Sequence, residues 1–290
     1  MNNVKIRILK DEPVISVIAE MELIPAGINE MAAWVASRRP ECMPDEYRDG
    51  DSSAWLSLFP RNVRDENCRL IDSSNELLVE LAGRKCYDSW GRKAGRKLNA
   101  EYIANTQAGD VGHFSIMYHA KMTFFIAGVS RRVSHELIRH YVGADRTEEG
   151  SPSQESTRYV EHSGCYIAHP AILDNDEEMA LFAGAMERNY TEYRDYIERC
   201  NAIYFSGHGE LPKGMARKRI FESASPYLSH ACETSFVWTS NPIALAKMFK
   251  ERDNEAADLE YLRFARKWKR LCVARWPGLF PQPWMQVEAR

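Results

Sequence analysis

The stretch that decides the fold runs from residue 122 to residue 140 and reads MTFFIAGVSRRVSHELIRH. Its first half is densely apolar but too short to span a membrane, so a buried strand is expected over residues 113–128. Ser130 is a residue type that caps helices, and the helix after it should run to about His140. The sequence therefore predicts a buried strand that leads directly into a helix.

The predicted helix has two unlike faces. Val133, Leu137 and Tyr141 recur at every fourth position and form an apolar side. Arg132, Glu136 and Arg139 recur with helical spacing on another side: this is the charged face. The helix should therefore pack one side against the core and present charged groups, arginines among them, on the other.

Working outward, hydrophobic periodicity predicts elements on both sides of this unit. Further strands are expected over residues 4–9, 15–24, 155–161 and 234–239. Helices are expected over residues 29–37, 74–87, 97–106, 175–205, 212–223, 241–251 and 256–276. Residues 38–68 are polar, aperiodic and proline-containing, and residues 143–152 form a charged loop, so both are expected at the surface. The order of strands and helices favours an α+β fold, taken as one domain over residues 1–290.

Composition narrows the class of protein. The chain has 290 residues and a net charge of −3, with 44% hydrophobic and 27% charged residues, which is ordinary for a globular protein. No apolar run is long enough for a membrane span, and seven cysteines without a regular framework fit a reduced, cytoplasmic protein. Arginines outnumber lysines, 26 to 12, within a balanced charge. This favours specific anion contacts over diffuse nucleic-acid binding, although a genomic bias would give the same count.

Two groups of residues have the types of a zinc site but not its spacing. His135 and His140 lie five residues apart, so on a helix they diverge by about 140° instead of sharing a face. His162, Cys165 and His169 lack an obvious fourth ligand. Both groups are more typical of surface or core residues, and no metal is predicted.

A third group of polar residues comes from three separate segments. Arg139 and His140 end the predicted helix, and the segment Ser153-Gln-Glu-Ser-Thr-Arg158-Tyr159 follows the charged loop. Upstream lie His113, Ser115 and His119, around the predicted strand. Taken singly, each is a common cap or surface residue. Together they place guanidinium, hydroxyl and amide groups around a loop suited to a phosphorylated planar ligand.

These motifs resemble those of the flavin-dependent thymidylate synthases. The family signature of Arg-His-Arg, then a Ser followed by Arg-Tyr, resembles Arg139-His140-Tyr141 and Ser156-Thr-Arg158-Tyr159. Further family elements resemble, in order, Arg84-Lys-Cys86-Tyr87, His113-Phe-Ser115 with His119, Trp238-Thr-Ser-Asn241, Arg252 and Leu259-Glu260. The resemblance extends from about residue 74 to residue 276.

Several positions depart from the family pattern. The third signature residue is Tyr141 instead of Arg, and a Glu expected before the second His is Tyr118. Two further arginines are expected at Ser235, for the nucleotide, and at Ile243, for the flavin. The loop before Ser156 is also longer than usual, by residues 145–151. Arg217 or Arg219 from the preceding helix is a possible source of the missing charge.

The resemblance implies a fold, a reaction and a set of partners. The fold would be the family's α+β fold, a mixed sheet with long helices, assembled as a homotetramer with sites at subunit interfaces. The reaction would be methylation of C5 of a uracil nucleotide without a catalytic cysteine. Methylenetetrahydrofolate would supply the carbon, NADPH would reduce FAD, and reduced FAD would supply the hydride. Neither nucleic acid nor membrane would be a partner.

The same resemblance assigns roles to individual residues. Arg139 and Arg252 would be catalytic and would contact the substrate. The nucleotide site would also include Gln154, Ser156 and Arg158, with Arg158 toward the phosphate. FAD would be bound by His113, Ser115, His140, Tyr141 and Asn241, although Tyr141 also fits a packing role on the apolar stripe.

Alternatives remain at this point. The departures favour a relaxed enzyme acting on UMP and dUMP, as in divergent members from polyoxin-type antibiotic biosynthesis, over an ordinary enzyme acting on dUMP only. Two alternatives belong to other functional classes: a non-catalytic nucleotide-binding protein on the same fold, and a zinc hydrolase.

Overall fold

The computed structural model describes residues 6–48, 50–57, 59, 74–90, 99–107, 114–140, 150–207 and 213–280. Within them the strands form two sheets. The larger sheet is antiparallel, in the order β2 (Val14–Glu20), β3 (Met122–Ser130), β6 (Glu233–Ser240) and β4 (Gly150–Gln154). The smaller one pairs β1 (Arg7–Leu9) in parallel with β5 (Cys165–Ile167). The α+β prediction holds, but the predicted mixed sheet is divided into one antiparallel and one parallel sheet.

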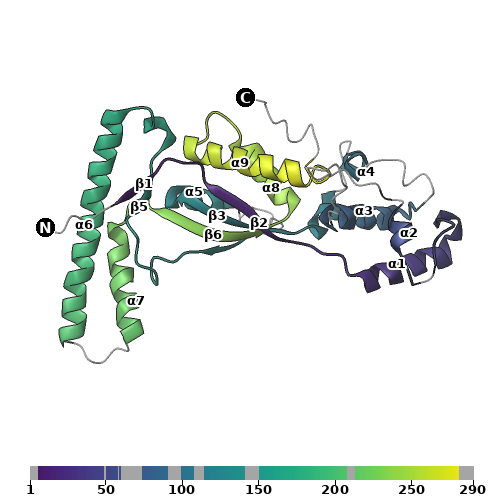
Figure 1. The fold of residues 1–290 in the computed structure, drawn as a ribbon, viewed down its shortest axis with the longest axis horizontal. Helices are drawn as coiled ribbons and strands as arrows, with labels where there is room; N and C mark the ends of the chain where they lie inside the picture. The colour runs from purple at the N-terminus through teal and green to yellow at the C-terminus, as the bar shows by residue number, and fades with distance from the viewer. Residues whose placement is uncertain are drawn as a thin grey trace.

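The helices lie around the larger sheet and at both ends of the molecule (Figure 1). Their bounds are α1 (Pro25–Arg38), α2 (Ser53–Leu56), α3 (Ser74–Tyr87), α4 (Asn99–Gln107), α5 (Arg131–Leu137), α6 (Asp176–Gly207), α7 (Lys213–Ala224), α8 (Pro242–Arg252) and α9 (Leu259–Arg275). Short 3₁₀ turns are η1 (Pro40–Cys42), η3 (Phe114–His119), η4 (Ile138–His140), η5 (Pro170–Ile172) and η6 (Ser225–Tyr227). Helices α1 to α3 lie at one end, and α6 and α7 at the other (Figure 1).

The main core lies between the large sheet and α9. Trp268 of α9 packs edge-on against Phe124 of β3, with ring centroids 5.0 Å apart, and both side chains are fully buried. Trp276 meets the same phenylalanine at 6.0 Å. Each of these rings removes a large apolar area from water, so together they fix α9 on the sheet. This matters for the site because α9 also contacts α5.

Strand β3 is shorter at its start than predicted and longer at its end. Residues 114–119 form the turn η3, so the expected strand over 113–128 is wrong in its first half, and residue 113 lies outside the described residues. The pairing with β6 shifts in register between Ile126 and Val129, and Gly128 in this irregular stretch has a φ of 72°, which favours glycine. The strand then ends at Ser130, where α5 begins.

The strand predicted over residues 155–161 is wrong. Strand β4 instead lies at Gly150–Gln154, overlapping the end of the loop expected over residues 143–152, and residues 157–160 form a turn. Pro152 is tolerated because β4 is at the edge of the sheet, where a missing N–H costs no ladder bond. The polar residues that looked like a strand are therefore an exposed turn.

The excursion predicted over residues 38–68 is not simply a surface segment. Among its described residues, Trp55 and Phe59 are buried in a second apolar cluster with Trp90 after α3. The rings of Trp55 and Trp90 lie 5.4 Å apart, and Arg39 donates to the carboxylate of Asp88 at 2.7 Å. The first part of this segment is therefore packed onto the end of α3, and residues 60–68 lie outside the described residues.

Candidate functional site

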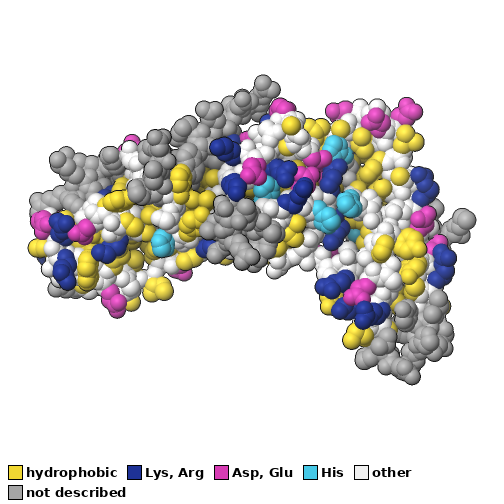
Figure 2. All heavy atoms as spheres, turned by 180° about the vertical axis from the view of Figure 1, so that it is seen from behind, with side chains coloured by type: hydrophobic (Ala, Val, Ile, Leu, Met, Phe, Trp, Pro, Cys, Tyr) yellow, Lys and Arg dark blue, Asp and Glu magenta, His cyan; other side chains and the backbone are white. Residues whose placement is uncertain are grey.

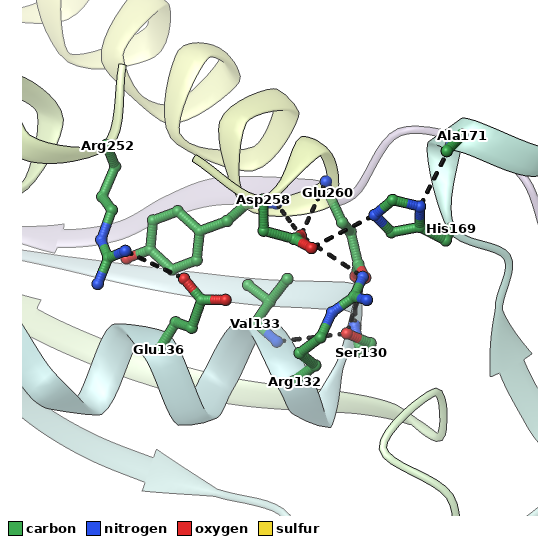
Figure 3. A network of polar contacts seen from close by, with 10 residues as sticks. Ser130, Arg132, Val133, Glu136, His169, Ala171, Arg252, Asp258 and Glu260 are labelled. Atoms are coloured by element: carbon green, nitrogen blue, oxygen red, sulfur yellow. Dashed lines mark hydrogen bonds and ion pairs between the residues drawn. The ribbon is translucent and has the colours of Figure 1, made fainter. Parts of the chain in front are cut away.

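The site predicted from sequence begins at the helix α5, and the start of this helix is held by a buried carboxylate. Ser130 caps α5 as predicted: its hydroxyl accepts a hydrogen bond from the backbone N–H of Val133 at 3.3 Å. Glu260, in the first turn of α9, accepts from both the N–H and the hydroxyl of Ser130, each at 2.8 Å. Arg132 donates to the same carboxylate at 2.7 Å (Figure 3). The charged face of α5 is thus turned toward α9.

The far end of α5 lies against Arg252, the last residue of α8. The guanidinium of Arg252 donates to Nε2 of His140 at 2.8 Å and to the carboxylate of Glu136 at 3.2 Å. It also lies over the ring of Tyr261, 5.1 Å from the centroid. Burial raises the pKa of the Tyr261 phenol well above its ordinary value, so the ring is neutral. Two predicted site residues, His140 and Arg252, are thus brought into direct contact.

The same contacts define the proton arrangement of His140. Its Nε2 accepts from Arg252, so a neutral ring carries its proton on Nδ1. That nitrogen lies 3.4 Å from the carboxylate of Glu251. His140 is therefore held from both sides by residues at the end of α8.

Arg139 is placed differently from Arg252. It lies in η4 next to His140 and its side chain is exposed. It makes no hydrogen bond or ion pair with another residue in the part of the chain that the structure describes. Among the described residues nothing holds its guanidinium, which is of the type that binds an anionic or carbonyl-bearing ligand.

Gln154 lies at the end of β4, on the other side of α5. Its side-chain amide donates to the hydroxyl of Ser134 on α5 at 2.9 Å and to that of Thr234 on β6 at 3.0 Å. These bonds join strand and helix, so they fix where the following turn begins. The next residue, Glu155, donates its N–H to the carbonyl of Ser235 at 3.1 Å. Ser235, one of the three positions where an arginine was expected, thus lies beside the predicted nucleotide segment.

Ser156 and Arg158 lie in the exposed turn after β4. The hydroxyl of Ser156 accepts from the N–H of Arg158 at 3.3 Å, which shapes the turn locally. Arg158 lies over the ring of Tyr159 at 5.6 Å, and Lys218 of α7 approaches the same ring at 5.4 Å. Two cations therefore meet on one exposed tyrosine. Lysine and arginine side chains gather over α7 on this face of the molecule (Figure 2).

The two arginines considered as replacements for the missing charge have other contacts. Arg219 pairs with Glu222 at 3.0 Å, and Arg217 lies over the ring of Phe221 at 5.2 Å. Lys218, between them, is the residue of α7 that reaches Tyr159 and hence the predicted nucleotide segment. The sequence did not single it out.

The exposed turn is anchored at its far end by His162. The N–H of His162 donates to the hydroxyl of Tyr193 at 3.2 Å, and its carbonyl accepts from that of Tyr190 at 3.1 Å. Its Nδ1 accepts from the N–H of Gly164 at 3.2 Å. Burial lowers the pKa of His162 to about 4, so the ring is neutral at pH 7. The turn therefore lies between two fixed points, Gln154 and His162.

Asn241 begins α8, while Arg252 ends it. The side-chain oxygen of Asn241 accepts from the N–H of Ala244 at 3.0 Å and caps the helix. The residue is fully buried, and its Nδ2 has no partner among the described residues. With a rise of about 1.5 Å per residue, the two ends of α8 are roughly 16 Å apart. Asn241 and Arg252 could therefore contact one ligand only if it is long, as a dinucleotide is.

The remaining predicted cofactor residues are only partly described. Ser115 is exposed in η3, which packs against α8. Ile243, where an arginine was expected for the flavin, is half-buried in α8 and packs on the main core. His113 and Tyr141 lie outside the described residues.

The residues considered for zinc have other roles here. His135 faces the ring of His230 at 5.3 Å, while His140 is held by Arg252. His169 accepts from the N–H of Ala171 and lies 3.3 Å from Asp258. Within the described ranges no group of three or more histidine, cysteine or acidic side chains is arranged for a metal.

A sequence profile of the family described as "Thymidylate synthase complementing protein" matches residues 69–278 of this chain. A flavin-dependent thymidylate synthase of Mycolicibacterium gilvum (strain PYR-GCK) is 38% identical over 206 residues, covering 70% of this chain and 77% of that protein. This chain belongs to the flavin-dependent thymidylate synthase family. The family member of Mycobacterium avium (strain 104) is 35% identical over 213 residues, covering 73% and 79%. Membership makes the chain an enzyme, a methyltransferase.

Solved structures agree on the fold of this family member. The UMP/dUMP methylase PolB from Streptomyces cacaoi, bound with 5-Br UMP, aligns with a TM-score of 0.52 at 15% identity, covering 93% of this chain and 92% of that one. ThyX of Helicobacter pylori, complexed with FAD and dUMP, aligns with a TM-score of 0.50 at 19% identity, covering 72% and 94%. None of the described helices is both long and apolar enough to cross a membrane.

Three residues of the site were not assigned a role from sequence. Glu136 and Tyr261 hold Arg252, and Glu260 holds the start of α5. A local signal existed for Glu136, which precedes His140 by one helical turn, and Glu260 was noted only as part of the Leu259-Glu260 family element. The contact of Glu260 with Ser130 spans 130 residues, and the contact of Tyr261 with Arg252 joins the start of α9 to the end of α8, so spacing along the sequence indicates neither.

Proposed function

We propose that this enzyme methylates C5 of a uracil nucleotide in a flavin-dependent reaction. Methylenetetrahydrofolate would supply the one-carbon unit, NADPH would reduce the flavin, and reduced FAD would supply the hydride. The observation that carries the proposal is the contact of Arg252 with the signature segment, through His140 and Glu136. It brings together two family motifs that lie 112 residues apart in the chain.

The chemistry requires a ring held and polarised by positive charge, because C5 of uracil is a weak carbon nucleophile. Arg252 is fixed by two hydrogen bonds and a ring contact, and Arg139, exposed in η4, is the chain neighbour of His140, which Arg252 contacts. Such groups hold the ring by its carbonyl oxygens and stabilise its enolate-like form, in which C5 has the electron density needed for attack. Preorganised charge of this kind costs little rearrangement during the reaction. No cysteine is needed as a nucleophile in this scheme.

The nucleotide phosphate would bind at the exposed turn after β4. Arg158 and Lys218 meet on the ring of Tyr159 and are suited to a dianion. Ser156 would contribute its hydroxyl, and Gln154 fixes the position of the turn. Lys218 would then supply positive charge in place of the arginine that the family pattern has at Ser235.

The groups present fit a flavin dinucleotide. Asn241 retains one donor, Nδ2, that is buried without a partner among the described residues, and Ser115 offers an exposed hydroxyl near the same helix. With His140 at the other end of α8, these groups would hold FAD along the helix, and the flavin would supply the hydride. His113 and Tyr141 are proposed to complete this set.

We also propose that the enzyme accepts UMP as well as dUMP. The structure of the UMP/dUMP methylase PolB aligns over 93% of this chain. The alignment with ThyX of H. pylori, in contrast, leaves more than a quarter of this chain without a counterpart. Tyr141, Ser235 and Ile243 stand where the family pattern has arginine. An altered wall of this kind can admit a ribose hydroxyl, and it fits a role in antibiotic biosynthesis.

A homotetramer in the cytoplasm is the proposed setting. Val14 and Ile18 of β2 and Phe125 of β3 are exposed apolar side chains on the large sheet, a pattern typical of subunit contacts. The six cysteines in the described residues are free thiols, as expected in a reducing compartment.

The experiment uses the purified full-length enzyme. A flavin absorbance spectrum, followed by product formation from UMP and from dUMP under identical conditions, is the expected result. A colourless protein that cannot be reconstituted with FAD would overturn the flavin reaction. Turnover of dUMP with no turnover of UMP would support the methylation but overturn the proposal that the enzyme also accepts UMP.

A further inference from the structure

The first turn of α9 contacts α5 at both of its ends, and no catalytic or binding role accounts for this. Glu260 and Tyr261 are consecutive in the chain, and both are buried. Glu260 reaches Ser130 and Arg132 at the start of α5 (Figure 3), while Tyr261 lies near His140, which follows α5. Helix α5 has only seven residues, about 10 Å of length, so one turn of a neighbouring helix can hold both ends.

At the start of α5, Glu260 accepts three hydrogen bonds, which form together only when α5 and α9 have the observed relative position. One oxygen takes the N–H of Ser130 at 2.8 Å, and the other takes the Ser130 hydroxyl at 2.8 Å and Arg132 at 2.7 Å. The same hydroxyl accepts from the N–H of Val133 inside the helix. Glu260 thus acts on the capping group itself, and its side chain is only 8% exposed.

The turn that carries Glu260 is itself fixed. Asp258 caps α9 by accepting the N–H groups of Glu260 and Tyr261 at 3.0 and 3.1 Å. Arg132 lies 3.5 Å from the same carboxylate. Nδ1 of His169 accepts from a backbone N–H, so the neutral ring has its proton on Nε2, which lies 3.3 Å from Asp258. The position of Glu260 is therefore not free to follow α5.

At the other end, Tyr261 supports the residues that face the reaction. Its ring lies 5.1 Å from the guanidinium of Arg252 and 6.2 Å from the ring of His140. A displacement of α5 relative to α9 would therefore separate His140 from Arg252. The fixed distance between Glu260 and Tyr261 in one helical turn ties the two ends together.

We propose that Glu260 is a positioning residue for the methylation: by holding Ser130 and Arg132, it sets α5 so that His140, which follows Arg139 in the chain, lies against Arg252. This inference rests on the proposed function for its kinetic consequence, but not for its structural one. A buried carboxylate with three donors is also an inefficient way to gain stability, because an apolar side chain of similar size would serve. The three hydrogen bonds to Glu260 form only in one arrangement of α5 and α9, and this makes Glu260 suited to positioning α5.

The test is Glu260→Gln, with Glu255→Gln as its control. Glutamine keeps one acceptor oxygen for Ser130 but removes the charge that pairs with Arg132. Glu255 lies in the segment that leads into α9, and its side chain is 83% exposed. We expect Glu260→Gln to lower kcat per bound flavin about tenfold at saturating dUMP, with amide exchange accelerated over residues 131–140 and the rest of the chain still protected. The control should change neither quantity.

Two outcomes separate this inference from the proposed function. A lower melting temperature with unchanged kcat per bound flavin and unchanged exchange over residues 131–140 would show that Glu260 only stabilises, and would overturn the inference. If the wild-type enzyme binds no flavin, the proposed function fails, and exchange over residues 131–140 alone then decides. Should Glu260→Gln not fold, Ser130→Ala removes one donor and is expected to give the same localised effect, several-fold smaller.

Discussion

Two sides of the site each place an arginine over a tyrosine ring, and they differ in almost everything else. Arg252 lies 5.1 Å from the ring of Tyr261, and this tyrosine is 0% exposed. Arg252 also donates hydrogen bonds to His140 and Glu136. Arg158 lies 5.6 Å from the ring of Tyr159, which is 57% exposed, in a turn. The same contact is stronger where water is excluded. The Arg252 side is therefore preorganised before a ligand binds, whereas the turn that carries Arg158 is suited to becoming ordered when a ligand binds.

The comparison assigns different tasks to the two arginines. The fixed side, formed by α5, α8 and α9, is suited to holding the reacting ring. The exposed side, formed by β4 and α7, is suited to capturing a phosphate. Variants on the fixed side should therefore lower kcat, whereas variants on the exposed side should raise KM.

The largest effect is expected for Arg252→Ala. Removing the preorganised guanidinium should lower kcat about a thousandfold, roughly 4 kcal/mol of transition-state stabilisation, because Glu136 and His140 also lose their partner. Arg252→Lys should recover little, since one ammonium cannot make both bonds. The measurement is steady-state kinetics with dUMP. Arg266→Ala, which removes a surface pair with Asp253 at the end of the same helix, is the matched control and should stay near wild type.

The next effect concerns stability and the anchor of the exposed turn. His162 has a pKa of about 4 in the folded protein against 6.5 ordinarily, so the unfolded chain takes up the proton first as the pH falls. Stability should be full above pH 6.5 and decline between pH 6.5 and pH 4, by about 2–3 kcal/mol from this group. His162→Gln should flatten that decline.

Denaturant unfolding at a series of pH values measures the effect. His135→Gln, at an exposed position, is the control and should keep the wild-type slope. An equal slope in His162→Gln and wild type would show that this anchor does not carry the acid sensitivity.

A smaller effect is expected for Arg158→Ala. KM for the nucleotide should rise about ten- to thirtyfold with kcat within a factor of three, because the lost contact is a charged hydrogen bond to the phosphate. Arg194→Ala removes a nearby surface arginine that pairs with Glu161 at 3.1 Å, and it should leave KM unchanged. A fall in kcat without a change in KM would reverse the roles assigned to the two sides.

The smallest effect is expected for Lys218→Met. A partly exposed ammonium near the phosphate should contribute a factor of about three in KM, and that factor should shrink as salt is added. Lys267→Met, another partly exposed lysine with an acidic partner, is the control. An effect that does not depend on ionic strength would mean that Lys218 acts by packing on Tyr159.

Local sequence determined much of the fold and the identity of the site segments. Residues 74–87 form the predicted helix α3 without a change of boundary, and Ser130 caps α5 as its residue type indicated. Such features depend on side-chain periodicity and on hydrogen bonds to the nearest turn, which short stretches specify by themselves. The family motifs were read in the same way, residue by residue.

The tertiary structure decided what those segments touch. The turn at residues 157–160 has a composition that also suits a strand, and the pairing of β4 with β6 placed the strand elsewhere. Trp55 is buried only because α3 and Trp90 meet it.

The contacts of Glu260 with Ser130 and of Arg252 with His140 span 130 and 112 residues. Neither has a local signal, because a contact of that kind exists only after the core has brought α8 and α9 against the sheet. The sequence alone therefore determined which residue types the site contains, while packing of distant helices decided which of them meet.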